Sequence, residues 1–523
     1  MPQPHPSRVV TVLLAAVGGV LTDTAFPQRG WWPMAIAGVA LLVLALLRDS
    51  ARWAALMGFV WGLAFFLPHI WWANYAVGVI PWVALSVAES GIVAATCAVW
   101  VWVRRGSLLG RWTLLQAPLF GVVWAVGEQV RQVWPFGGFP WGRLAFSQTD
   151  SPLLRLASLG GAPLVSGVVA ALGFLLALTV LRLREAEMLR GLAAPAIVAA
   201  ILAGSLLVPL GTNASAGTLE VGAVQGNVAE PGLGAFANAY EVLNNHVEGT
   251  QQLAEDVGPG TLDLVVWPEN ASDYNPRVYA DAEALVQEAV DAVDAPLLFG
   301  TDQYVEGSGP GGIDERYNEM VLWLPDEGPV YAYAKQIPAA FAEYIPMRNI
   351  ARIFSSAVDL VSVDMARGTE VAVVPVPVDR LERVVPVGTI ICFEVAYDAL
   401  VRESVLGGAE VLMVPTNNAS FGYTSESEQQ LAMSRFRAVE HGRATLQIST
   451  VGVSGVIAPN GVLLQTTELF TAEQLVADMP LRTEVTLSDR LGDAPIVVFT
   501  LLTALALITG IATAPRRLRG RRR

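Results

Sequence analysis

Long uninterrupted apolar runs dominate the first 211 residues and recur once near the end of the chain. Seven runs precede residue 212, at roughly 9–26, 32–47, 53–71, 81–103, 113–130, 159–181 and 191–211, and an eighth covers about 494–514. Most reach the ~20 residues that a helix needs to cross a hydrocarbon layer of ~30 Å. The pattern therefore predicts eight transmembrane helices, of which the second is short enough to be tilted or partly re-entrant.

The segment 212–493 has a different pattern, in which short β-branched runs alternate with amphipathic stretches. We expect strands at 219–224, 262–267, 296–300, 319–324, 385–391, 410–415, 445–451 and 453–458. We expect helices at about 236–256, 279–293, 397–407 and 426–442. Alternating strands and helices of these lengths predict a layered α/β domain with a core of its own.

Composition and charge support this division into a membrane domain at 1–211, an α/β domain at 212–493, and a last span with a basic tail at 494–523. Hydrophobic residues make up 53% of the chain and charged residues only 15%, which excludes a disordered, fibrous or nucleic-acid-binding protein. Segment 212–493 carries 14 basic and 40 acidic side chains, whereas the rest carries 19 and 7. With only two cysteines, Cys97 and Cys392, a disulfide scaffold and cysteine-based metal sites are also excluded.

Arginines between the apolar runs predict the orientation in the membrane. Fifteen lie before the first run, in alternate loops and in the tail, whereas the other loops hold only four, namely Arg29, Arg131, Arg143 and Arg155. Because basic residues concentrate on the cytoplasmic side, both termini are predicted to be cytoplasmic. Seven crossings then place the acidic α/β domain outside the cytoplasm.

An aromatic loop between the fifth and sixth runs has two interpretations. It reads QVWPFGGFPWGR and includes Trp134 and Trp141. Its aromatic side chains are typical of the membrane–water interface, but they would also suit a loop that contacts lipid or substrate. Glu89, within the fourth run, is either functional or a structural side chain that is protonated or faces the interior of the bundle.

Three places in the α/β domain carry candidate chemistry, and the first is the sequence LVVWPEN. An apolar strand ends there at Glu269. Groups at the carboxyl ends of strands in α/β domains face a ligand crevice. Taken alone, however, a carboxylate at such a place is more often a surface residue than a catalyst.

The second place is YAYAKQIP, where an apolar strand ends at Lys335. This is the only lysine in a chain that uses arginine for every other basic side chain. Lysine differs from arginine where a compact point charge or a proton donor is required. A functional role for Lys335 is therefore favoured over chance retention.

The third place is VPVGTIICFEVAYD, where Cys392 lies between an apolar strand and an expected helix. Turns of this kind present nucleophiles, and a helix N-terminus would lower the pKa of the thiol and offer backbone N–H groups to an oxyanion. The alternative is a buried, inert cysteine. His246 and His441 lie in helix-like stretches and are interpreted as structural, which leaves glutamate and lysine as the acid–base groups.

Together these places resemble the Glu–Lys–Cys triad of the nitrilase superfamily. With seven spans before the domain and one after it, nearly the full chain resembles the apolipoprotein N-acyltransferase family. The resemblance includes GFPWG followed by FSQ, VQGN, WPE, FAEYIP, ICFE, PTNNASFG, RFRAVEHGR and NG. Single motifs of this set are weak, but their order within this topology is highly specific.

The resemblance implies a nitrilase-type αββα sandwich joined to an eight-helix domain in a bacterial plasma membrane. It implies that Glu269 is the general base, that Lys335 stabilises the oxyanion and that Cys392 is the nucleophile. Glu343 and Glu394 would be supporting carboxylates, the backbone N–H of Phe393 an oxyanion donor, and Phe236 and Trp141 further substrate-contacting candidates. No metal or other cofactor is implied.

The activity implied is acyl transfer through a Cys392 thioester. The donor would be a membrane phospholipid, and the acceptor the α-amine of a diacylglyceryl-cysteine at the N-terminus of an apolipoprotein. A nucleic-acid partner is not expected, and a monomer suffices. A membrane-anchored nitrilase-type amidase and a catalytically inactive lipoprotein-binding protein are the alternatives.

The chain departs from the family pattern at four positions. Ser420 replaces a family tryptophan, Ala342 a glycine and Phe393 a tyrosine, while Phe236 is a substitute for a missing Lys–Trp pair. The triad itself is intact, so these changes bear on acyl-donor and lipoprotein selectivity and on rate.

Overall fold

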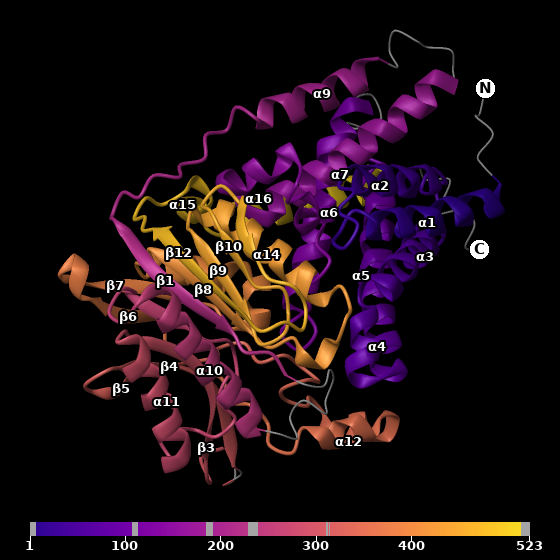
Figure 1. Cartoon of the computed structure of the whole chain (residues 1–523). Coiled ribbons are helices and arrows are strands. Elements are labelled where there is room, and N and C mark those ends of the chain that lie inside the picture. Colours follow the sequence, from indigo (N-terminus) through magenta and orange to yellow (C-terminus); the bar gives the residue numbers. More distant parts are fainter. Residues whose placement is uncertain are drawn as a thin grey trace. The chain divides into compact units, whose positions relative to one another are not determined.

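The computed structural model describes residues 7–106, 113–184, 192–228, 239–309, 312 and 314–513. The chain divides into two compact units, which are described separately (Figure 1). The helical unit comprises Met1–Trp71, Val79–Pro209 and Leu491–Arg523. The α/β unit comprises Trp72–Gly78 and Leu210–Arg490.

Each of the eight expected apolar runs contains a helix in the structure. The helices are α1 (Arg8–Asp23), α2 (Pro33–Ala45), α3 (Ala51–His69), α5 (Val79–Val103), α6 (Gln116–Val133), α7 (Ala157–Arg184), α9 (Ala193–Ser205) and α16 (Ala494–Thr513). Within the described residues, four stretches are long and apolar enough to cross a membrane, namely Ala51–His69, Val79–Val103, Pro152–Leu183 and Ala494–Thr513. Eight crossings therefore stay a prediction.

Small residues allow the helices of this unit to approach closely. A Cβ atom on Gly19 would lie 2.3 Å from the carbonyl oxygen of Trp61, and one on Gly121 would lie 2.2 Å from that of Gly167. In apolar surroundings such contacts supply much of the packing between helices. Glycine is thus required at these crossings because any side chain would separate the backbones.

A buried ion pair lies within the same unit. Arg131 of α6 donates from Nε to the carboxylate of Glu89 on α5, and its side chain also donates to the carbonyl oxygen of Trp141. Both charged side chains are almost fully buried. Glu89 therefore faces a partner inside the bundle, and Arg131 connects it to the aromatic loop.

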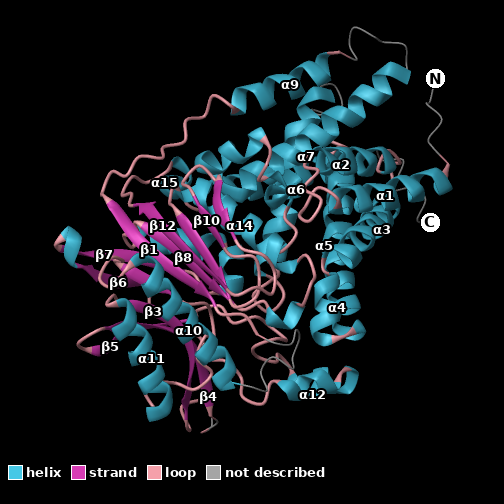
Figure 2. Ribbon diagram, in the orientation of Figure 1, coloured by secondary structure: helices cyan, strands magenta, loops and turns pink. Residues whose placement is uncertain are grey.

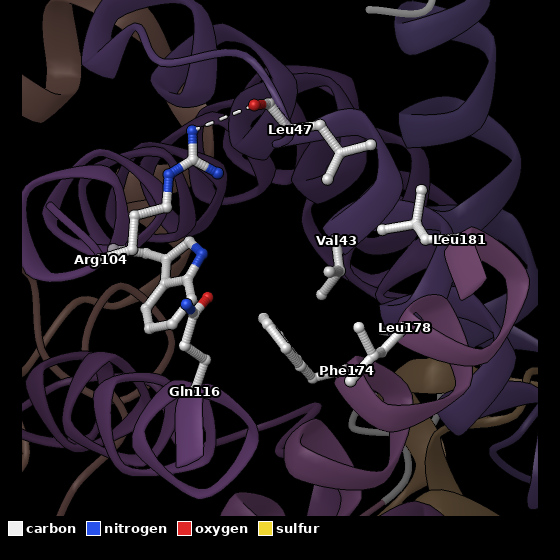
Figure 3. Close-up of a pocket in the computed structure, with 8 residues that line it drawn as sticks. Val43, Leu47, Arg104, Gln116, Phe174, Leu178 and Leu181 are labelled. Atoms are coloured by element: carbon white, nitrogen blue, oxygen red, sulfur yellow. Dashed lines mark hydrogen bonds between the residues drawn. The ribbon is translucent and has the colours of Figure 1, made fainter. Parts of the chain in front are cut away.

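A cavity of about 150 Å³ is also found in the helical unit (Figure 3). Its lining is mostly apolar and comprises Val43, Leu47, Trp100, Arg104, Gln116, Phe174, Leu178 and Leu181. The guanidinium of Arg104 donates to the carbonyl oxygens of Leu46, Leu47 and Arg48, just beyond the C-terminus of α2. Arg104 thus satisfies backbone carbonyl groups of the segment that links α2 to α3.

The α/β unit contains two six-stranded sheets (Figure 2). The first has the order β12-β1-β2-β3-β4-β5, formed by β12 (Glu473–Pro480), β1 (Thr218–Gln225), β2 (Leu264–Val266), β3 (Leu297–Val305), β4 (Glu315–Leu324) and β5 (Gly328–Ala334). The second has the order β11-β10-β9-β8-β7-β6, formed by β11 (Leu463–Thr466), β10 (Gly455–Ile457), β9 (Thr445–Ser449), β8 (Val411–Thr416), β7 (Arg383–Thr389) and β6 (Val373–Val378).

Helices pack on the faces of the two sheets. Helices α10 (Ala239–Val257) and α11 (Ala280–Val293) contribute Leu243, Val286 and Val290 to a core shared with Phe299 and Val321 of the first sheet. Helices α13 (Asp398–Leu406) and α14 (Glu426–His441) pack against β7 and β9 of the second sheet. The result is the αββα arrangement of a nitrilase-like domain, as predicted.

The described residues also form the short α-helices α4 (Trp71–Val77), α12 (Arg348–Phe354) and α15 (Leu487–Leu491). Helix α4 contributes residues to the α/β unit, where the indole of Trp72 donates to Oε1 of Gln429 at 3.3 Å. All eight strands with predicted ranges and all four expected helices of this unit occur in the structure, with ends that differ by a few residues, and residues 236–238 of the first expected helix lie outside the described residues.

Candidate active site

Glu269 follows the buried strand β2 and projects into a polar cluster. Its side chain is only 4% exposed. Oε1 accepts from Nδ2 of Asn318 at 2.7 Å and from Nζ of Lys335 at 2.9 Å, and Oε2 accepts from the backbone N–H of Asn417 at 3.0 Å. A Cβ on Gly300 would lie 2.7 Å from the Cα of Glu269, so a glycine is needed where β3 passes this turn.

Lys335 follows β5 and is buried between two carboxylates. Nζ donates to Glu269 and, at 2.6 Å, to Oε1 of Glu343. Burial alone would lower the pKa of Lys335, but the charges of Glu269 and Glu343 outweigh it and hold this pKa well above its usual value. Lys335 is therefore a fixed ammonium at neutral pH.

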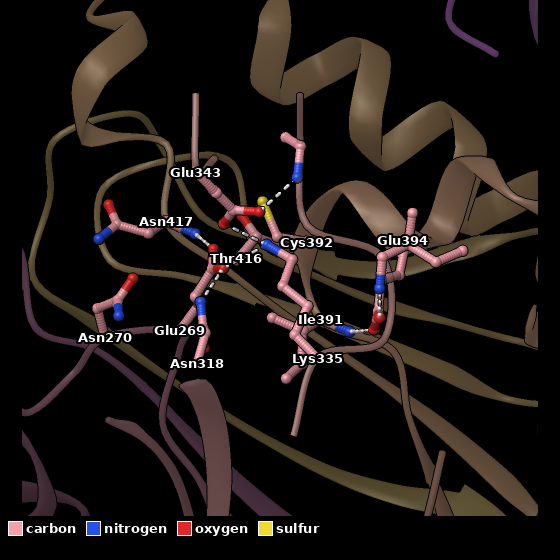
Figure 4. A network of polar contacts seen from close by, with 12 residues as sticks. Glu269, Asn270, Asn318, Lys335, Glu343, Ile391, Cys392, Glu394, Thr416 and Asn417 are labelled. Atoms are coloured by element: carbon pink, nitrogen blue, oxygen red, sulfur yellow. Dashed lines mark hydrogen bonds and ion pairs between the residues drawn. The ribbon is translucent and has the colours of Figure 1, made fainter. Parts of the chain in front are cut away.

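Glu343 lies in the loop that follows Lys335, close to the bridge between Ala340 and Tyr344. Besides the ion pair with Lys335, its Oε2 accepts from the backbone N–H of Ala339 at 2.6 Å. The side chain is 18% exposed, so it is the more accessible of the two carboxylates that hold the ammonium. Figure 4 shows Glu269, Lys335, Glu343 and Cys392 reaching one centre from separate segments.

Cys392 sits at the start of a short 3₁₀ turn (Cys392–Ala396) after β7. Its φ is +52°, a left-handed conformation that costs a non-glycine residue energy and that is often found at functional sites. Burial and the nearby charge of Glu269 raise the pKa of the thiol well above its ordinary value, although Lys335 opposes them. The expectation that a helix N-terminus lowers this pKa is therefore wrong, because one short turn does not offset burial.

Glu394 connects the cysteine turn to the lysine strand. Its carboxylate accepts from the backbone N–H groups of Gln336 at 2.6 Å, Ile337 at 3.0 Å and Ile391 at 3.0 Å. Burial raises the pKa of Glu394 to about 7, although Lys335 and these hydrogen bonds oppose that rise. Because it bonds to the segments that follow Lys335 and precede Cys392, Glu394 fixes their spacing.

Of the three other predicted site residues, Phe393 lies next to Cys392, whereas Trp141 and Phe236 are not placed at the site. The ring of Phe393 is partly buried and lies edge-on to Tyr397, with the centroids 5.5 Å apart. Trp141 belongs to the helical unit, where its side chain is 1% exposed, and Phe236 lies outside the described residues. Of the predicted set, the structure thus brings together Glu269, Lys335, Glu343, Cys392 and the Phe393–Glu394 pair.

Sequence reasoning did not single out two side chains next to these groups. Asn318 is in the interior of β4, and Gln430 is in the second turn of α14, where its Nε2 lies 3.5 Å from Sγ of Cys392. A buried polar residue within a strand or helix gives no motif on its own. Only the pairing of β4 with β5 and the packing of α14 bring these residues to the site.

The two histidines of the unit have structural partners. Nδ1 of His246 is 2.7 Å from the carbonyl oxygen of Val242, and its Nε2 accepts from the N–H of Gly226. Burial lowers the pKa of His246 to about 4, which fits a neutral ring. Nδ1 of His441 is 2.6 Å from Oδ1 of Asp489. Both contacts agree with the structural interpretation of these residues.

The cluster combines a thiol, a carboxylate able to take its proton and a fixed ammonium able to stabilise negative charge. This is the equipment of nucleophilic acyl transfer, in which a base activates a thiol and a cation stabilises an oxyanion. Among the described residues, no group of His, Cys, Asp or Glu side chains is arranged to hold a metal ion.

Two segments of the chain match known protein families. Residues 220–486 match the carbon–nitrogen hydrolase family, which is the class that the two-sheet fold and the Glu–Lys–Cys cluster indicate. Residues 18–175 match the apolipoprotein N-acyltransferase N-terminal domain.

The relatives then define the family. A protein of Mycolicibacterium smegmatis named apolipoprotein N-acyltransferase is 39% identical over 97% of this chain and 87% of its own length. Relatives of the same name from Ralstonia nicotianae and Geobacter metallireducens are 31% and 27% identical over 94% and 96% of this chain, and over 92% and 95% of their own lengths. The chain belongs to the apolipoprotein N-acyltransferase family and is accordingly a membrane-associated acyltransferase.

Solved structures similar to the chain include a variant of the amidase from Nesterenkonia sp. AN1, with 16% identity, a TM-score of 0.38 and coverage of 54% of this chain and 97% of the amidase. Another is Nit3 from Saccharomyces cerevisiae, with 16% identity, a TM-score of 0.37 and coverage of 53% and 95%.

Proposed function

We propose that the protein transfers a fatty acyl chain from a phospholipid to the α-amine of the S-diacylglyceryl-cysteine at the N-terminus of an apolipoprotein. The observation that carries this proposal is the position of Lys335, which is buried between Glu269 and Glu343 beside Cys392. The family to which the chain belongs supports the choice of acyl acceptor.

In the first half-reaction, Glu269 takes the proton of the Cys392 thiol. The thiolate attacks the ester carbonyl of the phospholipid, and the oxyanion is stabilised by Lys335 and the backbone N–H of Phe393. When the intermediate collapses, the ester C–O bond breaks and Glu269 returns its proton to the departing alkoxide. The products are an acyl thioester on Cys392 and a lysophospholipid.

In the second half-reaction, the free α-amine attacks the thioester carbonyl and the same groups stabilise the second oxyanion. Glu269 accepts a proton from the attacking nitrogen, the C–S bond breaks, and an amide forms. The Cys392 thiolate regains its proton from Glu269. The lysophospholipid departs once the acyl group is on Cys392, and the acceptor binds afterwards. One site can therefore serve both lipid substrates in turn. No step requires a cofactor.

Topology supports the assignment of substrates. We propose that residues 1–211 and 494–523 cross the membrane eight times with both termini in the cytoplasm, as the arginine distribution indicates. The catalytic domain at 212–493 then stands on the outer face of a bacterial plasma membrane. Lipoprotein N-termini and outer-leaflet phospholipids are both accessible there to a monomer.

Two other functions compete with this one. A membrane-anchored amidase would use the same triad and transfer the acyl group to water, but a hydrolase of soluble amides needs no helical unit of this size. A catalytically inactive lipoprotein-binding protein would have no need for a complete triad, and Glu269, Lys335 and Cys392 are all present.

The experiment is an intact-mass measurement on detergent-purified protein after incubation with phospholipid, with Cys392→Ala as the control. We expect a fatty-acyl adduct on the wild type alone, which persists in water and is discharged by a diacylglyceryl-cysteine peptide. Equally fast discharge by water would favour the hydrolase. The absence of any adduct on folded protein would favour the binding function.

Orientation can be tested with single cysteines in a chain that carries Cys97→Ala and Cys392→Ala. Ser215→Cys, in the exposed chain that precedes β1, should react with a membrane-impermeant maleimide in intact spheroplasts. Asp49→Cys, in the exposed link between α2 and α3, should react only after lysis. The opposite pattern would reverse the proposed orientation.

A further inference from the structure

The side chain of Gln430 points at the sulfur of Cys392 from α14. Its Nε2 lies 3.5 Å from Sγ, and the residue is fully buried. An amide N–H at this distance is a hydrogen-bond donor to sulfur, and a donor of this kind becomes stronger when its acceptor carries negative charge. Buried glutamine is uncommon because both ends of its amide need partners.

Asn418 determines which way the amide of Gln430 faces. Nδ2 of Asn418 donates to Oε1 of Gln430 at 2.9 Å, so the oxygen of Gln430 must face Asn418. The N–H₂ end is consequently directed to the sulfur. The orientation is therefore imposed by the hydrogen-bond network.

Asn418 is itself held at both ends of its side chain. Its Oδ1 accepts from Thr416 Oγ1 and Ser449 Oγ, each at 2.6 Å, and its Nδ2 also donates to Glu426 Oε2 at 2.7 Å. Asn418 is 2% exposed, and its partners are buried as well. A fully satisfied buried network of this kind is rigid and specifies a single arrangement.

From this geometry we infer that Gln430 is a further catalytic residue, whose amide N–H donates to the Cys392 sulfur while that sulfur carries negative charge. It acts when the thiolate forms before attack on the phospholipid, and again when the thiolate departs from the thioester. Asn418 is the positioning residue that holds Gln430 in the donating orientation. The inference rests on the proposed role of Cys392 as nucleophile.

Gln430 supplies an uncharged hydrogen-bond donor to the sulfur of Cys392, whereas the other groups considered around this sulfur are charged. Burial and the charges of Glu269 and Glu343 disfavour negative charge on the sulfur, and Lys335 opposes them. Lys335, however, is already held by both of these carboxylates. A neutral amide stabilises the thiolate without adding another charge to a crowded site.

The test is the rate at which iodoacetamide alkylates Cys392 across a range of pH, followed by intact mass on the full-length protein in detergent. Cys97→Ala is included throughout, so that Cys392 is the only thiol. Gln430→Met keeps the size of the side chain and removes the donor, whereas Gln430→Glu places an acceptor beside the sulfur. Gln429→Met is the matched control, because Gln429 is also buried on α14 but bonds to Trp72 and Ser425.

We expect the alkylation profile of Gln430→Met to move to higher pH by about one unit. Loss of a hydrogen bond to a charged group should shift the equilibrium between thiolate and thiol toward the thiol by about tenfold or more. Gln430→Glu should move it further, and Gln429→Met should leave it in place. In acyl transfer, kcat should fall more than KM rises. An unchanged profile in either Gln430 variant, with cooperative unfolding retained, would overturn the inference.

Because iodoacetamide requires no lipid, this result is separable from the proposed function. A shifted profile together with no acyl adduct on the wild type would retain Gln430 as a thiolate donor and reject the acyltransferase mechanism. An acyl adduct together with an unshifted profile would retain the acyltransferase mechanism and reject the role of Gln430 as a donor to the thiolate. If Gln430→Met does not fold, Gln430→Glu alone decides.

Discussion

Nζ of Lys335 lies 2.6 Å from Oε1 of Glu343, closer than the 2.9 Å that separates it from Oε1 of Glu269. Among the described residues, Glu269 accepts from two further donors, Nδ2 of Asn318 and the backbone N–H of Asn417, whereas Glu343 accepts from one, the backbone N–H of Ala339, in addition to the ammonium. The two carboxylates are thus not equivalent. In the proposed mechanism, Glu343 holds Lys335, while Glu269 is fixed by several donors as it exchanges a proton with Cys392.

Glu343→Gln should therefore reduce acyl transfer without abolishing it. Glutamine keeps an oxygen for Nζ of Lys335 but loses the charge, so kcat should fall by about 10- to 100-fold, which corresponds to one charge-assisted hydrogen bond. Lys335→Met should abolish adduct formation, because no cation would remain at the oxyanion. The measurement is the rate of thioester formation by intact mass. Equal rates in wild type and Glu343→Gln would refute the holding role of Glu343.

Gly452→Ala should damage the network behind Gln430. A Cβ at this position would lie 2.2 Å from Oδ1 of Asn418 and 2.7 Å from Oγ of Ser449. Overpacking of a rigid core costs about 1–3 kcal/mol, and displacement of Asn418 should also slow alkylation of Cys392.

Thermal unfolding and iodoacetamide kinetics measure the two effects. The matched control is Gly204→Ala on α9, where a Cβ would meet no atom within 4 Å. That variant should retain the unfolding temperature and the thiol reactivity of the wild type. Normal thiol reactivity in Gly452→Ala would mean that Asn418 tolerates displacement.

Glu426 should make stability depend on pH. Burial raises its pKa to about 8, although the hydrogen bond from Asn418 opposes the rise. An unfolded chain releases this proton near pH 4.5, whereas the folded protein keeps it until about pH 8. As the pH rises from 4.5 to about 8, the free energy of unfolding should therefore fall by about 1.4 kcal/mol per pH unit. Above pH 8 Glu426 should cause no further change.

Glu426→Gln should remove this contribution, since glutamine can still accept from Asn418 and cannot ionise. Glu394, Asp273 and Asp302 have pKa values raised to about 7, 7 and 6, so they share the lower part of the window. The difference between variant and wild type should thus still grow between pH 7 and 8. Thermal unfolding at closely spaced pH values would show it, and parallel curves would contradict the assignment.

The interior of each sheet could be predicted from sequence, whereas most of the edges could not. The strands absent from the expected set are β6, β11 and β12, which are three of the four edge strands of the two sheets, while the fourth, β5, was expected as the apolar strand that ends at Lys335. A strand at an edge is buried less and can contain proline, as β6 does with its sequence VVPVPV. The hydrophobic pattern of an edge strand is therefore weaker.

The site divides in a similar way. Glu269, Lys335 and Cys392 each follow a strand, so local patterning and the family motifs identify them. Asn318 and Gln430 lie in the interior of β4 and α14, and their relevance depends on register and helix packing that no local pattern specifies. The direction of the Cys392 pKa shift also depends on burial and on surrounding charges, which are properties of the folded domain.

The buried pair of Glu89 and Arg131 should show strong energetic coupling in the helical unit. Glu89→Gln leaves the guanidinium buried with a neutral partner, and Arg131→Met leaves the carboxylate without its cation, so each single change should cost about 3–5 kcal/mol. The double variant should cost less than the sum, because it leaves neither charge unpaired. Since Arg131 also donates to the carbonyl oxygen of Trp141, variants that lack this arginine should additionally loosen the aromatic loop.

Thermal unfolding of the wild type, the two single variants and the double variant in detergent measures the coupling energy of the pair. Hydrogen exchange at residues 134–143 measures how firmly the loop is held. Additive costs, with exchange in the loop unchanged, would show that the pair neither stabilises the bundle nor holds the loop.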